Sequence, residues 1–147
     1  MTKPSEHLTY KIAYISRMHK RKIDQDTLKY GLTNEQGRMI LYLHENEENP
    51  IHLKDLEKAF HLRKSSLNSV INNLEKNGFV TRSSCESDSR LKTISLTDLG
   101  REKVKLLNES FAMNEKLTKE VLTEEEITDL NRILDKIISK INKDGGK

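Results

Sequence analysis

Side chains able to hydrogen-bond with nucleic acid gather on one face of the segment 64–77. Its apolar residues share the opposite face, because they are spaced three, one and three positions apart: Leu67, Val70, Ile71 and Leu74. The polar face carries hydroxyls and amides, which bond to base edges and phosphates: Ser65, Ser69 and Asn72, with Lys76 beside them. A helix face that is merely solvated more often carries Glu, Lys or Ala, which are better helix formers than Ser and Asn. The pattern therefore favours a helix that contacts DNA.

A polar loop followed by an arginine comes after this helix. Residues 79–83 and 92–96 are predicted to be strands, the second because Ile94 and Leu96 alternate with polar residues. The loop 84–89 is polar and has no core to fill, so Arg90 is free to enter a minor groove, whose negative potential attracts a guanidinium. Asp88 can hold Arg90 in place through a charge-assisted hydrogen bond, and an ordinary surface ion pair is the alternative.

The elements that must position these residues follow from spacing and capping signals. Residues 53–60 have apolar residues at helical spacing, and His61 and Leu62 make a short turn. The next helix, here called the recognition helix, runs from about 64 to 77 and stops at Gly78, which suits a left-handed C-cap. Thr97 can cap a further helix from 98 to about 121. A helix-turn-helix followed by two strands and a loop is a winged helix, so the predicted fold class is mainly α with a small β wing.

Three motifs occur in a set order along the chain. Leu32-Thr33-Asn34-Glu35-Gln36 opens a helix, Leu74-Glu75-Lys76-Asn77-Gly78-Phe79-Val80 closes the recognition helix, and Asp88-x-Arg90 precedes Leu96-Thr97-x-x-Gly100. Through these motifs and the flanking helices, the chain resembles the MarR (multiple-antibiotic-resistance regulator) family of transcription regulators over essentially its whole length. The resemblance implies a homodimer that binds palindromic operators through a winged helix on each subunit and releases DNA when a small effector binds. It also maps the family's wing arginine and its aspartate partner onto Arg90 and Asp88.

The motifs and the resemblance predict one set of DNA-contacting residues and one set of effector-pocket residues. The predicted DNA-contacting residues are Arg63, Lys64, Ser65, Ser66, Asn68, Ser69, Asn72, Lys76, Arg82, Asp88 and Arg90. The resemblance places the effector between the dimerisation helices and the winged helix, and aromatic and Met side chains suit an adaptable pocket. The pocket residues predicted on this basis are Tyr10, Tyr14, Met18, Met39, Tyr42, Phe111 and Met113, each of which could equally serve the core.

The two ends of the chain are predicted to form a dimerisation region. A first helix is expected from about 5 to 30, ended by Gly31, with these candidate core residues: Leu8, Ile12, Ile15, Ile23 and Leu28. A second helix opens at Thr33 with a capping box to Gln36 and continues to about 46. The last helix opens with a second capping box, Thr123 to Glu126.

The last helix then carries an apolar seam with steps of three and four residues: Ile127, Leu130, Leu134, Ile137 and Ile141. A terminal helix this apolar favours packing against a second copy of the chain over packing within its own domain. We therefore expect residues 1–31 and 102–147 to form the helical dimerisation region and residues 32–101 the winged helix-turn-helix, within one intertwined domain.

Composition narrows the remaining function classes. The net charge is only +3, but residues 52–101 hold nine Lys or Arg against six Asp or Glu, as a phosphate-binding surface should. No apolar stretch approaches the roughly 18 residues of a membrane span, and the start of the chain lacks an apolar signal segment. The single cysteine excludes an intrachain disulfide framework. We expect a cytoplasmic protein without membrane contact.

Enzyme and metal chemistry find no support in the sequence. There is no glycine-rich phosphate loop and no nucleophile with a local base, and the five histidines are scattered rather than clustered. We expect no enzymatic activity, no cofactor and no metal. Thiol-sensing relatives resemble one another in carrying a reactive cysteine in the first helix, where this chain has none.

The sequence thus predicts a ligand-responsive, sequence-specific DNA-binding transcription regulator, acting as a homodimeric repressor on a palindromic operator. Its predicted partners are double-stranded DNA, a second copy of the chain and an unidentified small-molecule effector. Two alternatives stay open: a winged-helix protein-interaction module without DNA binding, and a redox-sensing regulator that acts through Cys85 in the wing loop.

Overall fold

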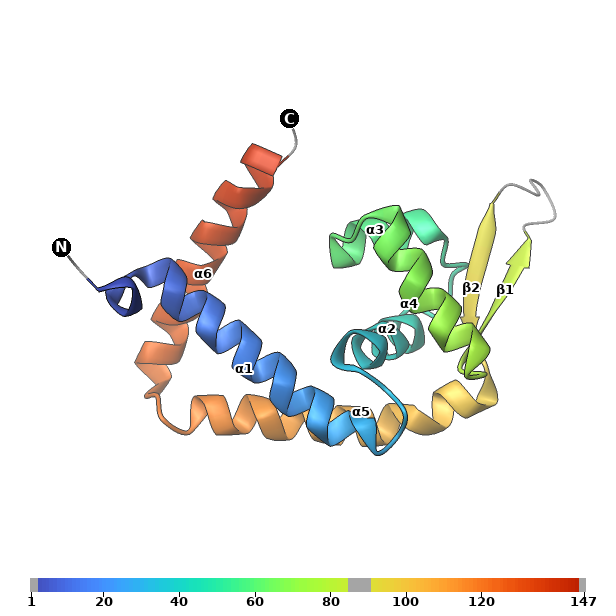
Figure 1. Ribbon diagram of the computed structural model, residues 1–147, viewed down its shortest axis with the longest axis horizontal. Coiled ribbons are helices and arrows are strands. Elements are labelled where there is room, and N and C mark those ends of the chain that lie inside the picture. Colours follow the sequence, from blue (N-terminus) through green and yellow to red (C-terminus); the bar gives the residue numbers. More distant parts are fainter. Residues whose placement is uncertain (1–2, 85–90, 146–147) are drawn as a thin grey trace. The chain divides into compact units, whose positions relative to one another are not determined.

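The computed structural model describes residues 3–84 and 91–145, which form six α-helices, one short 3-10 helix and a two-stranded antiparallel sheet (Figure 1). In chain order the elements are η1 (Pro4–Glu6), α1 (Leu8–Leu28), α2 (Asn34–Glu45), α3 (Leu53–Phe60), α4 (Lys64–Lys76), β1 (Val80–Ser84), β2 (Lys92–Leu96), α5 (Asp98–Lys119) and α6 (Glu124–Gly145). The predicted fold class, mainly α with a small β wing, is confirmed. The chain divides into two compact units, residues 1–111 and 112–147.

The core of the first unit lies between the apolar faces of α2, α3 and α4. Leu43 of α2, Leu56 of α3 and Leu67 of α4 are all completely or almost completely buried, and they belong to one cluster. The predicted apolar face of α4 is confirmed, because its leucines and Ile71 are buried and Val70 packs against the same cluster. Burial of this face leaves the polar face of α4 as the one turned to solvent.

The sheet closes one side of this core. β1 and β2 pair from Val80 opposite Leu96 to Ser84 opposite Lys92. The backbone N–H of Ile94 in β2 also donates to the carbonyl of Ile51 at 2.9 Å, so the segment before α3 lies along the second edge of β2. The short strands are thereby tied to the helix-turn-helix rather than projecting from it alone.

Two predicted capping boxes are confirmed. The Thr33 hydroxyl accepts from the backbone N–H of Gln36 at 3.3 Å, and the Gln36 side chain accepts from the Thr33 N–H at 3.0 Å. Thr123 and Glu126 form the same pair of bonds at 3.2 and 2.8 Å. Each box satisfies two N–H groups that a helix start leaves open, which fixes where α2 and α6 begin.

Thr97 joins the end of α4, the sheet and the start of α5. Its hydroxyl accepts from the Gly100 N–H at 3.1 Å, as a cap should, and donates to the Gly78 carbonyl at 2.6 Å. Gly78 itself has a φ of +81°, the left-handed conformation predicted for the end of the recognition helix. This junction holds the recognition helix and the strands of the wing in one arrangement.

The first helix differs from its prediction in both bounds and packing. It begins at Leu8, after η1, rather than near residue 5. Of the five candidate core residues only Ile23 is buried, and the other four were wrongly assigned because they are exposed in the single chain: Leu8, Ile12, Ile15 and Leu28. Helical spacing identifies an apolar face, but it does not identify what covers that face.

The second unit contains the end of α5 and the whole of α6. No residue of α6 is buried in the described chain, and Leu130, Ile138 and Ile141 are exposed by 42%, 52% and 62%. Within the described ranges, none of the helices combines the length and the apolar character that crossing a membrane requires.

Candidate nucleic-acid interface

The outward face of α4 gathers hydrogen-bonding side chains. Ser65, Ser66, Ser69 and Asn72 are exposed, and Asn68 is half-buried beside them. Lys76 is exposed in the last turn of the same helix. Short hydroxyl and amide side chains on an outer helix face allow close approach to base edges in a major groove. The structure therefore brings these predicted residues together on one surface.

The start of α4 is open to an anion. Arg63 occupies the N-cap position without a side-chain cap hydrogen bond in the described chain, and the first turn holds no acidic residue. The free backbone N–H groups and the positive end of the helix dipole suit a phosphate. Arg63 and Lys64 are both exposed here, so their charges reinforce the same preference.

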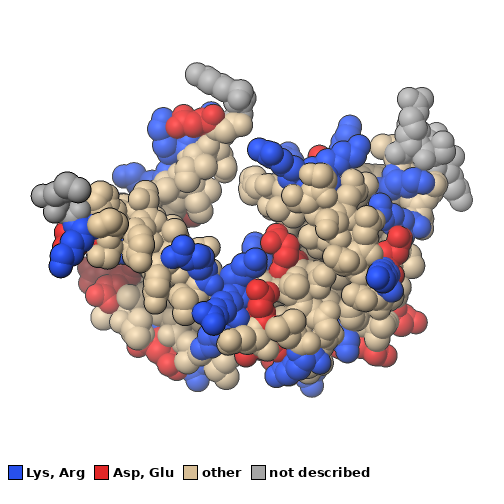
Figure 2. Space-filling model, viewed as in Figure 1, with Lys and Arg blue, Asp and Glu red and all other residues tan. Residues whose placement is uncertain are grey.

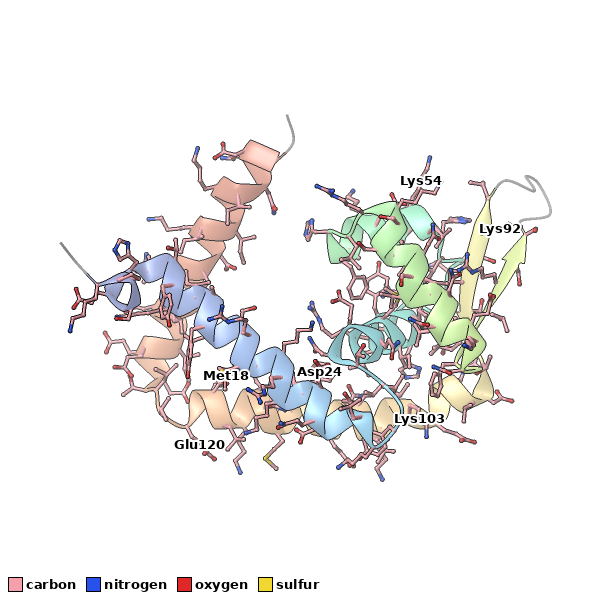
Figure 3. The ribbon with its side chains drawn as sticks, in the orientation of Figure 1. Met18, Asp24, Lys54, Lys92, Lys103 and Glu120 are labelled. Atoms are coloured by element: carbon pink, nitrogen blue, oxygen red, sulfur yellow. The ribbon has the colours of Figure 1, made fainter. Side chains whose placement is uncertain are left out.

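Basic side chains continue along one edge of the first unit. Lys54, in the first turn of α3, and Lys92, at the start of β2, lie at the same edge of the view in Figure 3, and Figure 2 shows Lys and Arg gathered along it. The Lys92 ammonium also donates to the Ser84 hydroxyl at 3.0 Å, which links the two strands near the wing loop. Lys54 was not predicted. Its place on the first helix of the helix-turn-helix, which crosses the DNA backbone in such motifs, is the signal that could have found it.

Asp88 and Arg90, predicted to form the minor-groove contact, and Cys85 lie outside the described residues. The strands that enter and leave the loop are described, and they bring residues 84 and 91 to the basic edge that contains Lys92.

Arg82 of β1 turns toward α4. Its guanidinium donates to the Asn72 side-chain oxygen, and its Nε lies 3.7 Å from a Glu75 carboxylate oxygen. Arg82 and Asn72 were predicted to make separate DNA contacts, and their contact with each other was not predicted. They are ten residues apart on different elements, so no local pattern joins them.

Only part of the predicted effector pocket comes together. Tyr42 and Phe111 line a cavity of about 350 Å³ in the first unit, together with Arg38 and Phe60. The Tyr42 and Phe60 rings meet edge to face with centroids 5.5 Å apart, and the Arg38 guanidinium lies 5.8 Å from the Phe60 centroid. The aromatic walls suit a flat ligand, and the lining also holds one positive and one negative side chain, Arg38 and Glu45.

The remaining predicted pocket residues do not line this cavity. Met39 has no exposed surface and belongs to the core between the helices. Tyr10 and Tyr14 stack on α1 with ring centroids 6.4 Å apart, and both are exposed. Met18 and Met113 are exposed as well.

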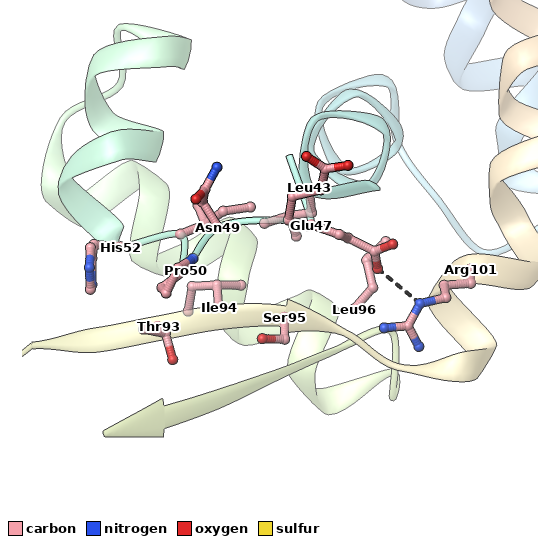
Figure 4. Close-up of a pocket in the computed structure, with 12 residues that line it drawn as sticks. Leu43, Glu47, Asn49, Pro50, His52, Thr93, Ile94, Ser95, Leu96 and Arg101 are labelled. Carbon is pink, nitrogen blue, oxygen red and sulfur yellow. Dashed lines mark hydrogen bonds and ion pairs between the residues drawn. The ribbon is translucent and has the colours of Figure 1, made fainter. Parts of the chain in front are cut away.

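A second cavity in the first unit was not predicted. It has a volume of about 570 Å³ and lies between the end of α2, the segment before α3 and strand β2 (Figure 4). An ion pair between Arg101 and Glu47, with N···O 2.9 Å, spans one side of it, and Arg101 also contacts Asp98 at 3.1 Å. Glu47 and Arg101 are 54 residues apart, so their meeting leaves no trace in the local sequence.

The residues predicted for dimerisation keep exposed apolar surface. Ile127, Leu134 and Ile137 are half-buried in the single chain, and Leu130 and Ile141 are exposed.

Within the described ranges, no group of three or more His, Cys, Asp or Glu side chains lies close enough together to hold a metal ion.

Comparison with known proteins adds an independent result. Residues 30–91, which span α2 to the wing, match the profile of the MarR family. The crystal structure of MepR from S. aureus in complex with DNA resembles this chain with a TM-score of 0.88 at 28% sequence identity. The match covers 92% of this chain and 98% of that one.

Two more distant structures share the fold. The MarR regulator of Oenococcus oeni PSU-1 matches 90% of this chain and 99% of its own, with a TM-score of 0.76 and 24% identity. The transcriptional regulator SlyA matches 93% of this chain and 95% of its own, with a TM-score of 0.86 and 20% identity. In each comparison the match covers at least nine tenths of this chain, so it extends beyond the winged helix.

Proposed function

We propose that this chain, which matches the MarR family profile over residues 30–91 and the MepR structure over 92% of its length, is a sequence-specific DNA-binding transcription regulator. It acts as a homodimeric repressor on a palindromic operator and responds to a small-molecule effector. MepR, which shares 28% of its residues with this chain, has been solved bound to DNA. The proposal extends that activity to this chain through the residues of its own winged helix.

The observation that carries the proposal is the outward face of α4. Its core-facing residues Leu67, Ile71 and Leu74 are completely buried, so Ser69 and Asn72 on the other side must face solvent. The uncapped, basic start of the helix supplies a phosphate contact, which positions the helix without reading sequence. The hydroxyls and amides then supply the sequence-dependent contacts.

The dimer follows from apolar surface that the single chain leaves uncovered. Exposed large apolar residues occur along α1, the end of α5, the turn that follows it and α6, and among them Leu8, Val121 and Ile141 are exposed by 65%, 82% and 62%. A soluble protein rarely leaves this much apolar surface open unless a partner covers it. A second copy related by a two-fold axis would place two recognition helices on a palindromic site.

The effector site is proposed at the cavity lined by Tyr42, Phe60 and Phe111. Its volume of about 350 Å³ is near the lower end for small-ligand pockets, which suits a single aromatic ring system. Arg38 and Glu45 both line the cavity, so its wall offers one cationic and one anionic group to the polar part of a ligand.

Selection from a random DNA library tests the proposal. The chain should enrich a sequence with two inverted half-sites about one helical turn apart, and mass measurement should give two chains per duplex. Ser69→Glu should weaken binding to the enriched site by roughly tenfold or more, because it adds a negative charge to the proposed DNA face. Gln25→Glu, an exposed change of the same charge on α1, is the matched control.

An unenriched library would contradict sequence-specific binding and would favour a winged-helix module that binds protein. Equal loss of binding in Ser69→Glu and Gln25→Glu would contradict the placement of DNA on α4. It would show that the added negative charge weakens binding wherever it lies on the chain.

A further inference from the structure

The Arg82 side chain is directed by the period of its strand. Val80 and Arg82 lie two residues apart in β1, so their side chains leave the same face of the strand. Val80 is buried in the core beneath α4, and Arg82 follows it toward the same helix. There its guanidinium reaches Asn72 and Glu75, which lie one helical turn apart on α4.

This contact determines which end of the Asn72 amide faces outward. A guanidinium has five N–H donors and no acceptor, so the atom that faces it must be the amide oxygen. The oxygen is therefore held toward β1, and the amide nitrogen with its two N–H groups is left for other partners.

The orientation changes what Asn72 can read. An asparagine that pairs with adenine uses its oxygen to accept from N6 and its nitrogen to donate to N7. Here the oxygen already accepts from Arg82, and the adjacent positive charge opposes the approach of another hydrogen-bond donor. The two amide N–H groups instead suit an acceptor at the position where adenine presents its N6 donor, namely O6 of guanine or O4 of thymine; N7, which adenine shares with guanine, does not distinguish the two bases.

We propose that Arg82 is a positioning residue that makes Asn72 a hydrogen-bond donor, so that the base read by Asn72 is guanine or thymine rather than adenine. An asparagine without this contact would be expected to pair with adenine, and the contact with Arg82 prevents that pairing. The inference rests on the proposed function, because it assigns a specificity to the same recognition helix.

Glu75 completes the arrangement. Its carboxylate lies 3.7 Å from Arg82 Nε and offsets the guanidinium charge, and only 24% of the Arg82 side chain is exposed. A partly buried, neutralised arginine contributes little to phosphate binding compared with an exposed one. Arg82 therefore acts on specificity through Asn72 more than on overall DNA affinity.

The test compares the base preferences selected by the parent and by variants at both positions. In the parent, one base position should prefer guanine or thymine over adenine by roughly fivefold to tenfold, the range expected for a single amide contact. Asn72→Ala should abolish this preference at that position alone. Arg82→Ala should relax the same position so that adenine is accepted, and Arg82→Lys should restore the preference, because an ammonium also donates to the amide oxygen.

Two further variants separate positioning from charge. Asn72→Asp keeps an oxygen for Arg82 but presents a second oxygen outward, so the preference should move to cytosine or adenine, whose exocyclic amino groups donate. Lys92→Ala removes the same charge as Arg82→Ala from the neighbouring strand, and it should lower affinity without changing any base preference. Thermal unfolding of each variant shows that the fold is kept, and Arg82→Lys tests the proposal if Arg82→Ala unfolds.

The outcomes distinguish this inference from the function on which it rests. If the parent selects no sequence at all, the proposed function is wrong and the inference falls with it. If the parent selects a palindrome but Asn72 and Arg82 variants change different positions, or if the parent prefers adenine where Asn72→Ala acts, only the inference is overturned.

Discussion

Gly100 lies in the first turn of α5, where the structure leaves no room for a side chain. A Cβ at this position would lie 2.3 Å from the Phe79 carbonyl oxygen and 3.1 Å from Cδ2 of Leu96. The Phe79 backbone is held on both sides, since its carbonyl accepts from the Thr97 N–H at 3.1 Å and its N–H donates to the Leu74 carbonyl at 2.9 Å. Unlike the end of a flexible side chain, this carbonyl cannot rotate away.

The expected cost of Gly100→Ala is a balance of two terms. In an unobstructed helix, alanine is more stable than glycine by about 0.5–1 kcal/mol. Forcing an extra carbon into a packed site costs about 1–3 kcal/mol, and here the contact must open by about 1 Å to become ordinary. We expect the clash to prevail, with a net loss of about 1–2 kcal/mol and a fall in Tm of about 2–8 °C for a chain of this size.

Thermal unfolding followed by circular dichroism at matched protein concentration measures this change. Gly145→Ala is the control, because a Cβ there meets nothing within 4 Å and should leave Tm unchanged or slightly higher. A Gly100→Ala protein as stable as the parent would refute the reasoning, since it would show that the Phe79 backbone yields at no cost.

Three other changes test separate parts of the structure. Gly78→Ala should lose about 1–2 kcal/mol through its φ of +81° alone, as measured by urea unfolding against the parent. Arg90→Ala should weaken operator binding by about 1–3 kcal/mol with circular dichroism and dimer mass unchanged, and unaltered affinity at matched salt would exclude a minor-groove contact. Replacing Leu134 and Ile137 with Glu puts charges into the proposed dimer interface, so light scattering should show monomer or unfolded chain. A parent that is itself monomeric at micromolar concentration, yet binds its operator tightly, would contradict the proposal that the apolar seam of α6 forms a dimer interface.

The elements of this fold were predictable because their signals are local. The capping boxes at Thr33 and Thr123 and the glycine at position 78 each depend on residues within four positions of one another, and the structure places the helix ends there. The alternation in 92–96 likewise predicted β2 with its correct bounds. Local hydrogen bonds determine where these helices begin and end, so tertiary packing moves their boundaries little.

The errors and omissions concern contacts between distant segments. Ile12 and Ile15 have the spacing of core residues, yet spacing cannot tell whether a face is covered by the same chain or remains open to a second one. The pairing of Arg82 with Asn72 was missed because it depends on how β1 packs across α4. The ion pair of Glu47 with Arg101 joins residues 54 positions apart, so predicting it requires knowing how the segment after α2 packs beside the start of α5.

A mobility-shift titration tests whether this chain reads DNA sequence as a dimer. The duplex is the intergenic DNA upstream of the chain's own gene, compared at the same salt concentration with a shuffled duplex of equal length and composition. We expect a saturable complex with two chains per site and an affinity at least about a thousandfold above that for the shuffled duplex. Equal affinity for the two duplexes, or no complex with either, would contradict it.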